Sequence, residues 1–111
     1  MSEINLIRKC IKKCGENSQL LKLVEECEEL AKEVVQYVNT QNFGFVPINR
    51  NAILEEYVDV LITMKYAKEI LHITNEEINS IKTEKYKRLI EFLNTGENCK
   101  YRNRRRINDE R

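Results

Sequence analysis

The chain has 111 residues, of which 41% are hydrophobic and 33% charged, with a formal net charge of +1, one proline and three glycines. This length predicts one domain with one core, and no apolar run approaches the ~20 residues that a membrane-spanning helix needs. The N-terminus lacks the apolar segment and cleavage site of a signal peptide, so we expect a cytoplasmic protein with no membrane partner.

The first half of the chain predicts two helices. Residues 3–14 form the first, which Gly15 ends, because isoleucines recur on one face. The second begins at a cap on Asn17 or Ser18 and follows the 3.6-residue period to about Val38. Residues 39–50, which contain a glycine and the single proline, are predicted to be the one long loop.

The second half predicts two more helices. The third begins at Asn49 or Asn51 and continues to about Leu71. Thr74 and Glu77 have the spacing of a capping box and start the fourth helix, which ends at Gly96. No β-type alternation is present, so the predicted fold class is all-α, with about four helices per chain.

The four cysteines indicate neither a disulfide framework nor a zinc site. Cys10 and Cys14 are four residues apart and share a helix face, which is not the spacing of a CxxC pair. The chain has a single histidine, so the usual zinc ligands are poorly supplied. Reduced thiols that partly fill the core are the favoured interpretation.

Two acidic pairs share one spacing. Glu26 and Glu29 lie three residues apart on the second helix, and Glu56 and Asp59 do so on the third. Each pair presents two carboxylates on one face. The acidic face of the second helix, taken alone, fits a solvated surface.

The third helix favours a different interpretation. Its circumference is almost entirely apolar, which predicts burial on nearly every side. We therefore expect Glu56 and Asp59 to be at least partly buried, and buried charges must be paired or bind metal.

A metal site follows if the second and third helices pack as an antiparallel hairpin, because the two acidic pairs can then lie at the same level. Facing carboxylates repel one another unless cations lie between them. Oxygen ligands without histidine or thiolate favour Mg²⁺ or Mn²⁺. A di-iron bundle is the competing metal site, but it needs two Glu-x-x-His motifs, and this chain has only Glu69 and His72.

The C-terminal segment differs from the rest of the chain. Residues 99–111 contain six basic and two acidic residues, a balance of +4, and little apolar content. We expect a flexible basic tail at residues 97–111, after a domain at residues 1–96. Tyr101 is its only aromatic residue, which disfavours nucleic acid as a partner.

The acidic motifs resemble a known family signature. EECEE at residues 25–29, followed by EYVD at residues 56–59, is similar to the EExxE…ExxD pattern of the MazG-like all-α nucleoside triphosphate pyrophosphohydrolases, in their small, phage-type form. The resemblance extends over roughly residues 4–93. It includes a closing helix in which Lys85, Tyr86 and Arg88 match recurring residues.

This resemblance implies a function and a site. The chain would cleave nucleoside triphosphates to the monophosphate and pyrophosphate, as a homodimer or homotetramer whose subunits complete the helical bundle. Glu25 would support the metal ligands or help to activate water. Mg²⁺ would be held by four carboxylates, those of Glu26, Glu29, Glu56 and Asp59. Three basic residues would bind the phosphate oxygens: Lys22, Lys85 and Arg88.

Two alternatives remain open from the sequence. One is a non-catalytic helical dimer of the same fold that binds a nucleotide or a protein. The other is a small nucleic-acid-binding protein that uses the basic tail, and its binding would weaken steeply as salt rises.

Overall fold

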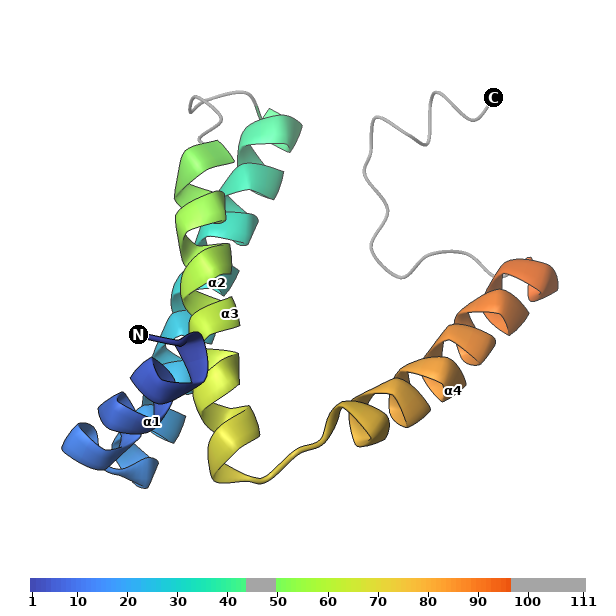
Figure 1. Ribbon diagram of the computed structural model, residues 1–111. Helices are drawn as coiled ribbons and strands as arrows, with labels where there is room; N and C mark the ends of the chain where they lie inside the picture. Colours follow the sequence, from blue (N-terminus) through green and yellow to red (C-terminus); the bar gives the residue numbers. More distant parts are fainter. Residues whose placement is uncertain (44–49, 97–111) are drawn as a thin grey trace. The chain divides into compact units, whose positions relative to one another are not determined.

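The computed structural model describes residues 1–43 and 50–96, and these form four helices (Figure 1). The first helix, α1, spans Glu3–Cys14 as predicted. The Ser2 hydroxyl caps it by accepting a hydrogen bond from the Asn5 backbone N–H. Gly15 ends it with φ of 91°, a value that favours glycine over residues with a β-carbon.

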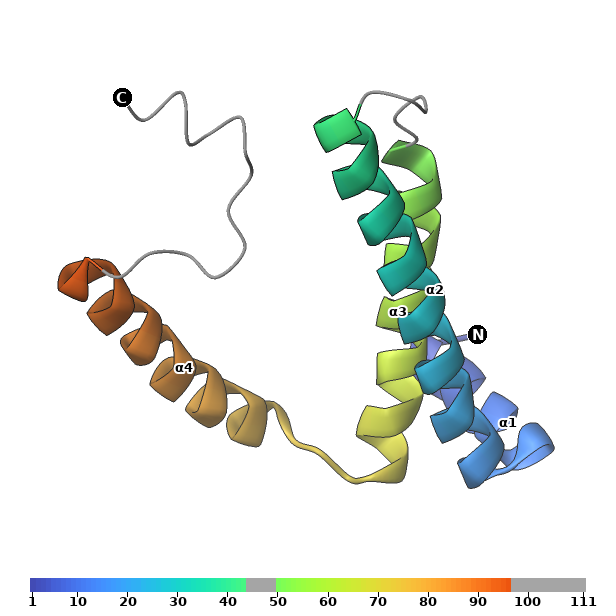
Figure 2. The same cartoon turned by 180° about the vertical axis from the view of Figure 1, so that it is seen from behind.

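An antiparallel hairpin of α2 (Glu16–Phe43) and α3 (Arg50–Ile70) forms most of the first unit. The two helices lie side by side in both views (Figures 1 and 2). This confirms the hairpin arrangement that the acidic pairs required.

Several predicted helix boundaries were wrong. The helix α2 begins at Glu16, before the expected caps Asn17 and Ser18, and continues past Val38 to Phe43. Residues 39–43 contain neither glycine nor proline, so nothing in them stops the helix. At the start of α3, Asn51 lies inside the helix, and Asn49 is outside the described residues.

The short helix α1 packs against both helices of the hairpin. Two exposed ion pairs join it to α3: the Arg8 Nε lies 2.7 Å from the Glu69 carboxylate, and Lys65 pairs with Glu3. Exposed pairs of this kind contribute at most about 1 kcal/mol each, so apolar contacts carry most of the packing energy.

The fourth helix, α4 (Asn75–Thr95), begins at the predicted capping box. The Thr74 hydroxyl accepts from the Glu77 N–H, and the Glu77 carboxylate accepts from the Thr74 N–H. Gly96 ends the helix in the left-handed conformation. The chain divides into two compact units, Met1–His72 and Ile73–Arg111.

We expect the Thr74→Ala variant to lose about 1 kcal/mol of helix stability, because the Glu77 backbone N–H loses the hydroxyl oxygen that accepts its hydrogen bond. Circular dichroism during thermal unfolding should show lower helicity and a lower midpoint. Thr74→Ser keeps the hydroxyl and should behave almost as the wild type. Equal losses in both variants would show that the cap does not stabilise α4.

The predicted burial of α3 was wrong for the single chain. Thr63 is its only buried residue, while many of its apolar side chains are between 42 and 53% exposed. These side chains are Leu54, Tyr57, Val58, Leu61, Ile62 and Met64. The hairpin partner and α1 cover only part of a helix that is apolar on nearly every side.

Among the described residues, no helix is both long and apolar enough to cross a membrane. Cys10, Cys14 and Cys27 are free thiols, but the expectation that thiols help to fill the core is wrong for Cys14 and Cys27, which are exposed; Cys10 is half-buried. Cys99 and the predicted basic tail at residues 97–111 lie outside the described residues.

Candidate metal centre

Three carboxylates meet across the α2–α3 groove. Glu26 projects from α2, and Glu56 and Asp59 project from successive turns of α3. One oxygen of each lies within 4.8 Å of the others. The antiparallel packing produces this meeting, because it places the middle of α2 beside the first half of α3.

The three carboxylates differ in burial. Glu26 is buried, with 9% of its surface exposed, and Glu56 is half-buried. Asp59 is exposed in the single chain, so the expectation that Glu56 and Asp59 are both partly buried holds for Glu56 alone. Asp59 loses its predicted apolar surroundings because the neighbouring apolar side chains of α3 are themselves exposed.

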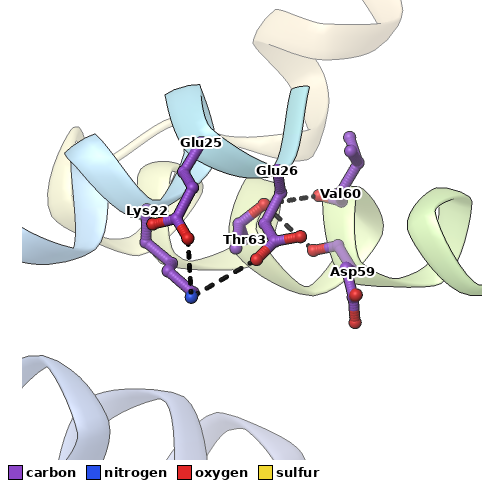
Figure 3. Close-up of polar contacts among 6 residues, drawn as sticks. All are labelled: Lys22, Glu25, Glu26, Asp59, Val60 and Thr63. Atoms are coloured by element: carbon purple, nitrogen blue, oxygen red, sulfur yellow. Dashed lines mark hydrogen bonds and ion pairs between the residues drawn. The ribbon is translucent and has the colours of Figure 1, made fainter. Parts of the chain in front are cut away.

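Lys22 partly balances the negative charge (Figure 3). Its ammonium group lies 3.3 Å from the Glu26 carboxylate and 3.6 Å from that of Glu25. The hydrogen bond to Glu26, followed by the charges of Glu25 and Glu26, raises the pKa of Lys22 above its ordinary value. Lys22 therefore stays protonated at neutral pH.

The pKa of Glu56 is raised above its ordinary value. Desolvation raises its pKa, and the negative charges of Asp59, Glu26, Glu29 and Glu33 raise it further. The negative charges of four nearby carboxylates make the ionised form of Glu56 less favourable in free energy. A bound cation would offset this repulsion.

The raised pKa of Glu56 predicts how stability depends on pH. Without metal, the folded chain binds more protons than the unfolded chain between the ordinary value of 4.5 and the raised pKa. The free energy of unfolding should therefore fall as pH rises through this window. Glu56→Gln should remove this contribution and be more stable than the wild type at neutral pH.

Urea unfolding in chelated buffer, from about pH 4 to about pH 8, measures this slope. Glu55→Gln is the matched control, because Glu55 is an exposed neighbour on α3 that does not belong to the carboxylate group. If Glu56→Gln is less stable than the wild type at neutral pH, the repulsion at Glu56 has been misassigned.

The other predicted site residues have different surroundings. Glu25 pairs with Lys22 and is exposed. Glu29 is exposed on α2 and lies outside the three-carboxylate group, although its charge acts on Glu56. Lys85 and Arg88 are exposed on α4, in the second unit, so their role at the site remains a prediction.

A cavity of about 170 Å³ adjoins the carboxylates. Sequence reasoning did not single out four of its lining residues, Gln19, Ile62, Thr63 and Tyr66. Gln19 and Thr63 are buried, and the Thr63 hydroxyl bonds to the backbone carbonyls of Asp59 and Val60 (Figure 3). The only available signal was a glutamine about two helical turns before Glu26, on the same face of α2.

The donor set suits a hard divalent cation. Three carboxylates converge from two helices, and neither histidine nor thiolate belongs to the group. Such ligands favour Mg²⁺ or Mn²⁺ over the softer transition metals. No protein-family model, no curated protein and no solved structure matches this chain.

Proposed function

We propose that the protein is a Mg²⁺-dependent nucleoside triphosphate pyrophosphohydrolase of the MazG-like type. The observation that carries this proposal is the convergence of Glu26, Glu56 and Asp59 within 4.8 Å. Their positions match the acidic motifs on which the family resemblance rests. The antiparallel hairpin also supports it, because it unites residues that are 30 positions apart in the sequence.

Each residue of the site has a distinct task in this proposal. Glu26, Glu56 and Asp59 hold the metal, and Glu29 is the fourth predicted ligand. When bound, Mg²⁺ neutralises phosphate charge and lowers the pKa of water. In this proposal Lys22 binds a phosphate oxygen, and the ion pair with Glu25 keeps that lysine near Glu26.

The test is incubation of the protein with a panel of ribo- and deoxyribonucleoside triphosphates plus Mg²⁺, followed by chromatographic separation of the products. We expect nucleoside monophosphate and pyrophosphate, and no turnover in chelator. The choice of the bond between the α- and β-phosphates rests on the family resemblance, since a carboxylate group suits other phosphate chemistry equally well.

Other products would lead to other conclusions. Nucleoside diphosphate and orthophosphate would show cleavage at the γ-phosphate and overturn the assignment. If no product forms from any nucleotide, the non-catalytic binding protein becomes the better description.

A further inference from the structure

Two thiols of α1 lie on one face of the helix. Cys10 and Cys14 are four residues apart, and both lie inside the helix that spans Glu3–Cys14. Cys10 is half-buried, Cys14 is exposed, and both are free thiols. Side chains four residues apart on a helix have their β-carbons about 5–6 Å from each other. The two sulfur atoms can therefore approach one point from the same surface of α1.

Tyr66 of α3 shows what this face of α1 contacts. Burial raises the pKa of the Tyr66 hydroxyl, and Cys10 raises it further through a hydrogen bond and through its charge. The charge of Cys14 acts on the same hydroxyl. Both thiols therefore lie near one phenol group, where α1 packs against α3. A phenol O–H can donate a hydrogen bond to a thiolate sulfur and stabilise its negative charge.

The helical spacing of the two thiols disfavours a disulfide and suits a bridging metal ion. A disulfide needs its β-carbons about 3.5–4.5 Å apart, so Cys10 and Cys14 cannot form one while the last turn of α1 stays helical. A metal ion between two thiolates holds the sulfur atoms up to about 4.6 Å apart, which is twice a metal–sulfur bond of about 2.3 Å. This larger span is compatible with the spacing on the helix.

The small number of ligands favours a soft monovalent ion over zinc. Structural zinc sites use four protein ligands, and catalytic zinc sites use three. Within residues 1–43 and 50–96, the only three His, Cys, Asp or Glu side chains that converge closely enough to share an ion are Glu26, Glu56 and Asp59. Two thiolates alone complete the linear coordination of Cu(I), which prefers soft sulfur ligands.

The charges around the two thiols also suit Cu(I). Two thiolates and one Cu(I) ion together carry a single negative charge. The last turn of α1 contains Lys12 and Lys13, and Lys22 of α2 is close enough to lower the pKa of Tyr66. These positive charges offset the negative end of the helix dipole, which disfavours thiolates at the C-terminus of a helix.

We propose that Cys10 and Cys14 form a binding site for a soft monovalent cation, Cu(I), on α1. Binding forms two copper–sulfur bonds, breaks two S–H bonds and releases two protons to water, with no change in oxidation state. The site shares no residue with the three-carboxylate group, and the inference does not depend on the proposed function.

The experiment titrates the full chain with Cu(I) under anaerobic conditions, in competition with a coloured Cu(I) chelator. The wild type should bind one ion per chain. Cys10→Ser and Cys14→Ser should each bind at least about 100-fold more weakly, because a direct ligand matters more than the outer partners whose loss costs about 10–100-fold. Cys27→Ser and Cys99→Ser are matched controls that remove thiols outside the pair, and both should bind like the wild type.

A further variant tests the positions of the thiols and not only their number. Lys12→Cys combined with Cys14→Ser keeps two thiols on α1 but places them two residues apart, on different faces. It should bind Cu(I) as weakly as Cys14→Ser, while its circular dichroism matches the wild type. Wild-type affinity in this variant, or in folded Cys10→Ser, would overturn the inference.

Two more measurements separate the proposed site from other thiol chemistry. Zn²⁺ should bind the wild type more weakly than Cu(I), because the two thiols lack the additional ligands that zinc requires. Mild oxidation of the folded chain should produce no disulfide between Cys10 and Cys14, as mass spectrometry of the protein would show. Tighter binding of Zn²⁺, or such a disulfide in a chain of unchanged helicity, would contradict the geometry of the site.

Discussion

Replacing Asp59 by asparagine is expected to lower Mg²⁺-dependent hydrolysis at least about 100-fold, because a metal ligand contributes several kcal/mol to stabilising charge in the transition state. The same substitution should leave the metal-free fold intact or slightly more stable. Asp59 lies with Glu26 and Glu56 within 4.8 Å, so its charge repels theirs. Steady-state hydrolysis and thermal unfolding, with and without Mg²⁺, measure both effects.

The stability measurement decides between two roles for Asp59. If Asp59 were paired with a buried cation, its removal would strand that cation and cost about 3–5 kcal/mol. Glu55→Gln serves as the control, since Glu55 is an exposed neighbour on α3 outside the carboxylate group. A large fall in the melting temperature of metal-free Asp59→Asn would contradict the metal site.

Light scattering at micromolar concentration is expected to give the mass of a dimer or tetramer. Six apolar side chains of α3 are between 42 and 53% exposed, and α4 has no buried residue. On α4, Ile81, Leu89 and Ile90 are each more than half exposed. A 21-residue helix is only marginally stable in water without tertiary packing, so its apolar face needs a partner surface.

Leu89→Glu tests whether subunits provide that surface. A charge placed in an apolar interface should weaken association by roughly 100-fold or more. Asn94→Glu adds the same charge at an exposed position about 140° away around α4 and should have little effect. A monomeric mass for the wild type would contradict the predicted assembly.

Local signals in the sequence predicted the individual helices well. The bounds of α1 and the capping box of α4 were predictable because each depends on residues within one turn. The end of α2 was misjudged, since the helix continues through residues 39–43 until glycine and proline become close. Propensity alone cannot locate a helix end when no strong breaker is present.

The site was predictable in part, because two acidic pairs on consecutive helices can lie at the same level if the helices pack as an antiparallel hairpin, and they do. A helical wheel places Glu26 and Glu29 on one face but does not say which of them enters the groove, and the structure places Glu26 there. Gln19 and Tyr66 join the site only through the packing of α2 on α3, which the sequence does not specify at atomic detail. A helical wheel predicted burial of α3 on nearly every side, but α2 and α1 cover only part of that surface.

At the proposed metal site, the ion pair between Lys22 and Glu26 would make the binding of a divalent cation an exchange of counterions. In the metal-free protein an ammonium group already neutralises the most buried of the three carboxylates, so the hairpin can fold before any metal is present. If Mg²⁺ binds as proposed, it would compete with this ammonium group, and the affinity would be the net result of that exchange. Lys22 would then lie free beside the ion-binding carboxylates and supply a second positive charge for a polyanionic ligand.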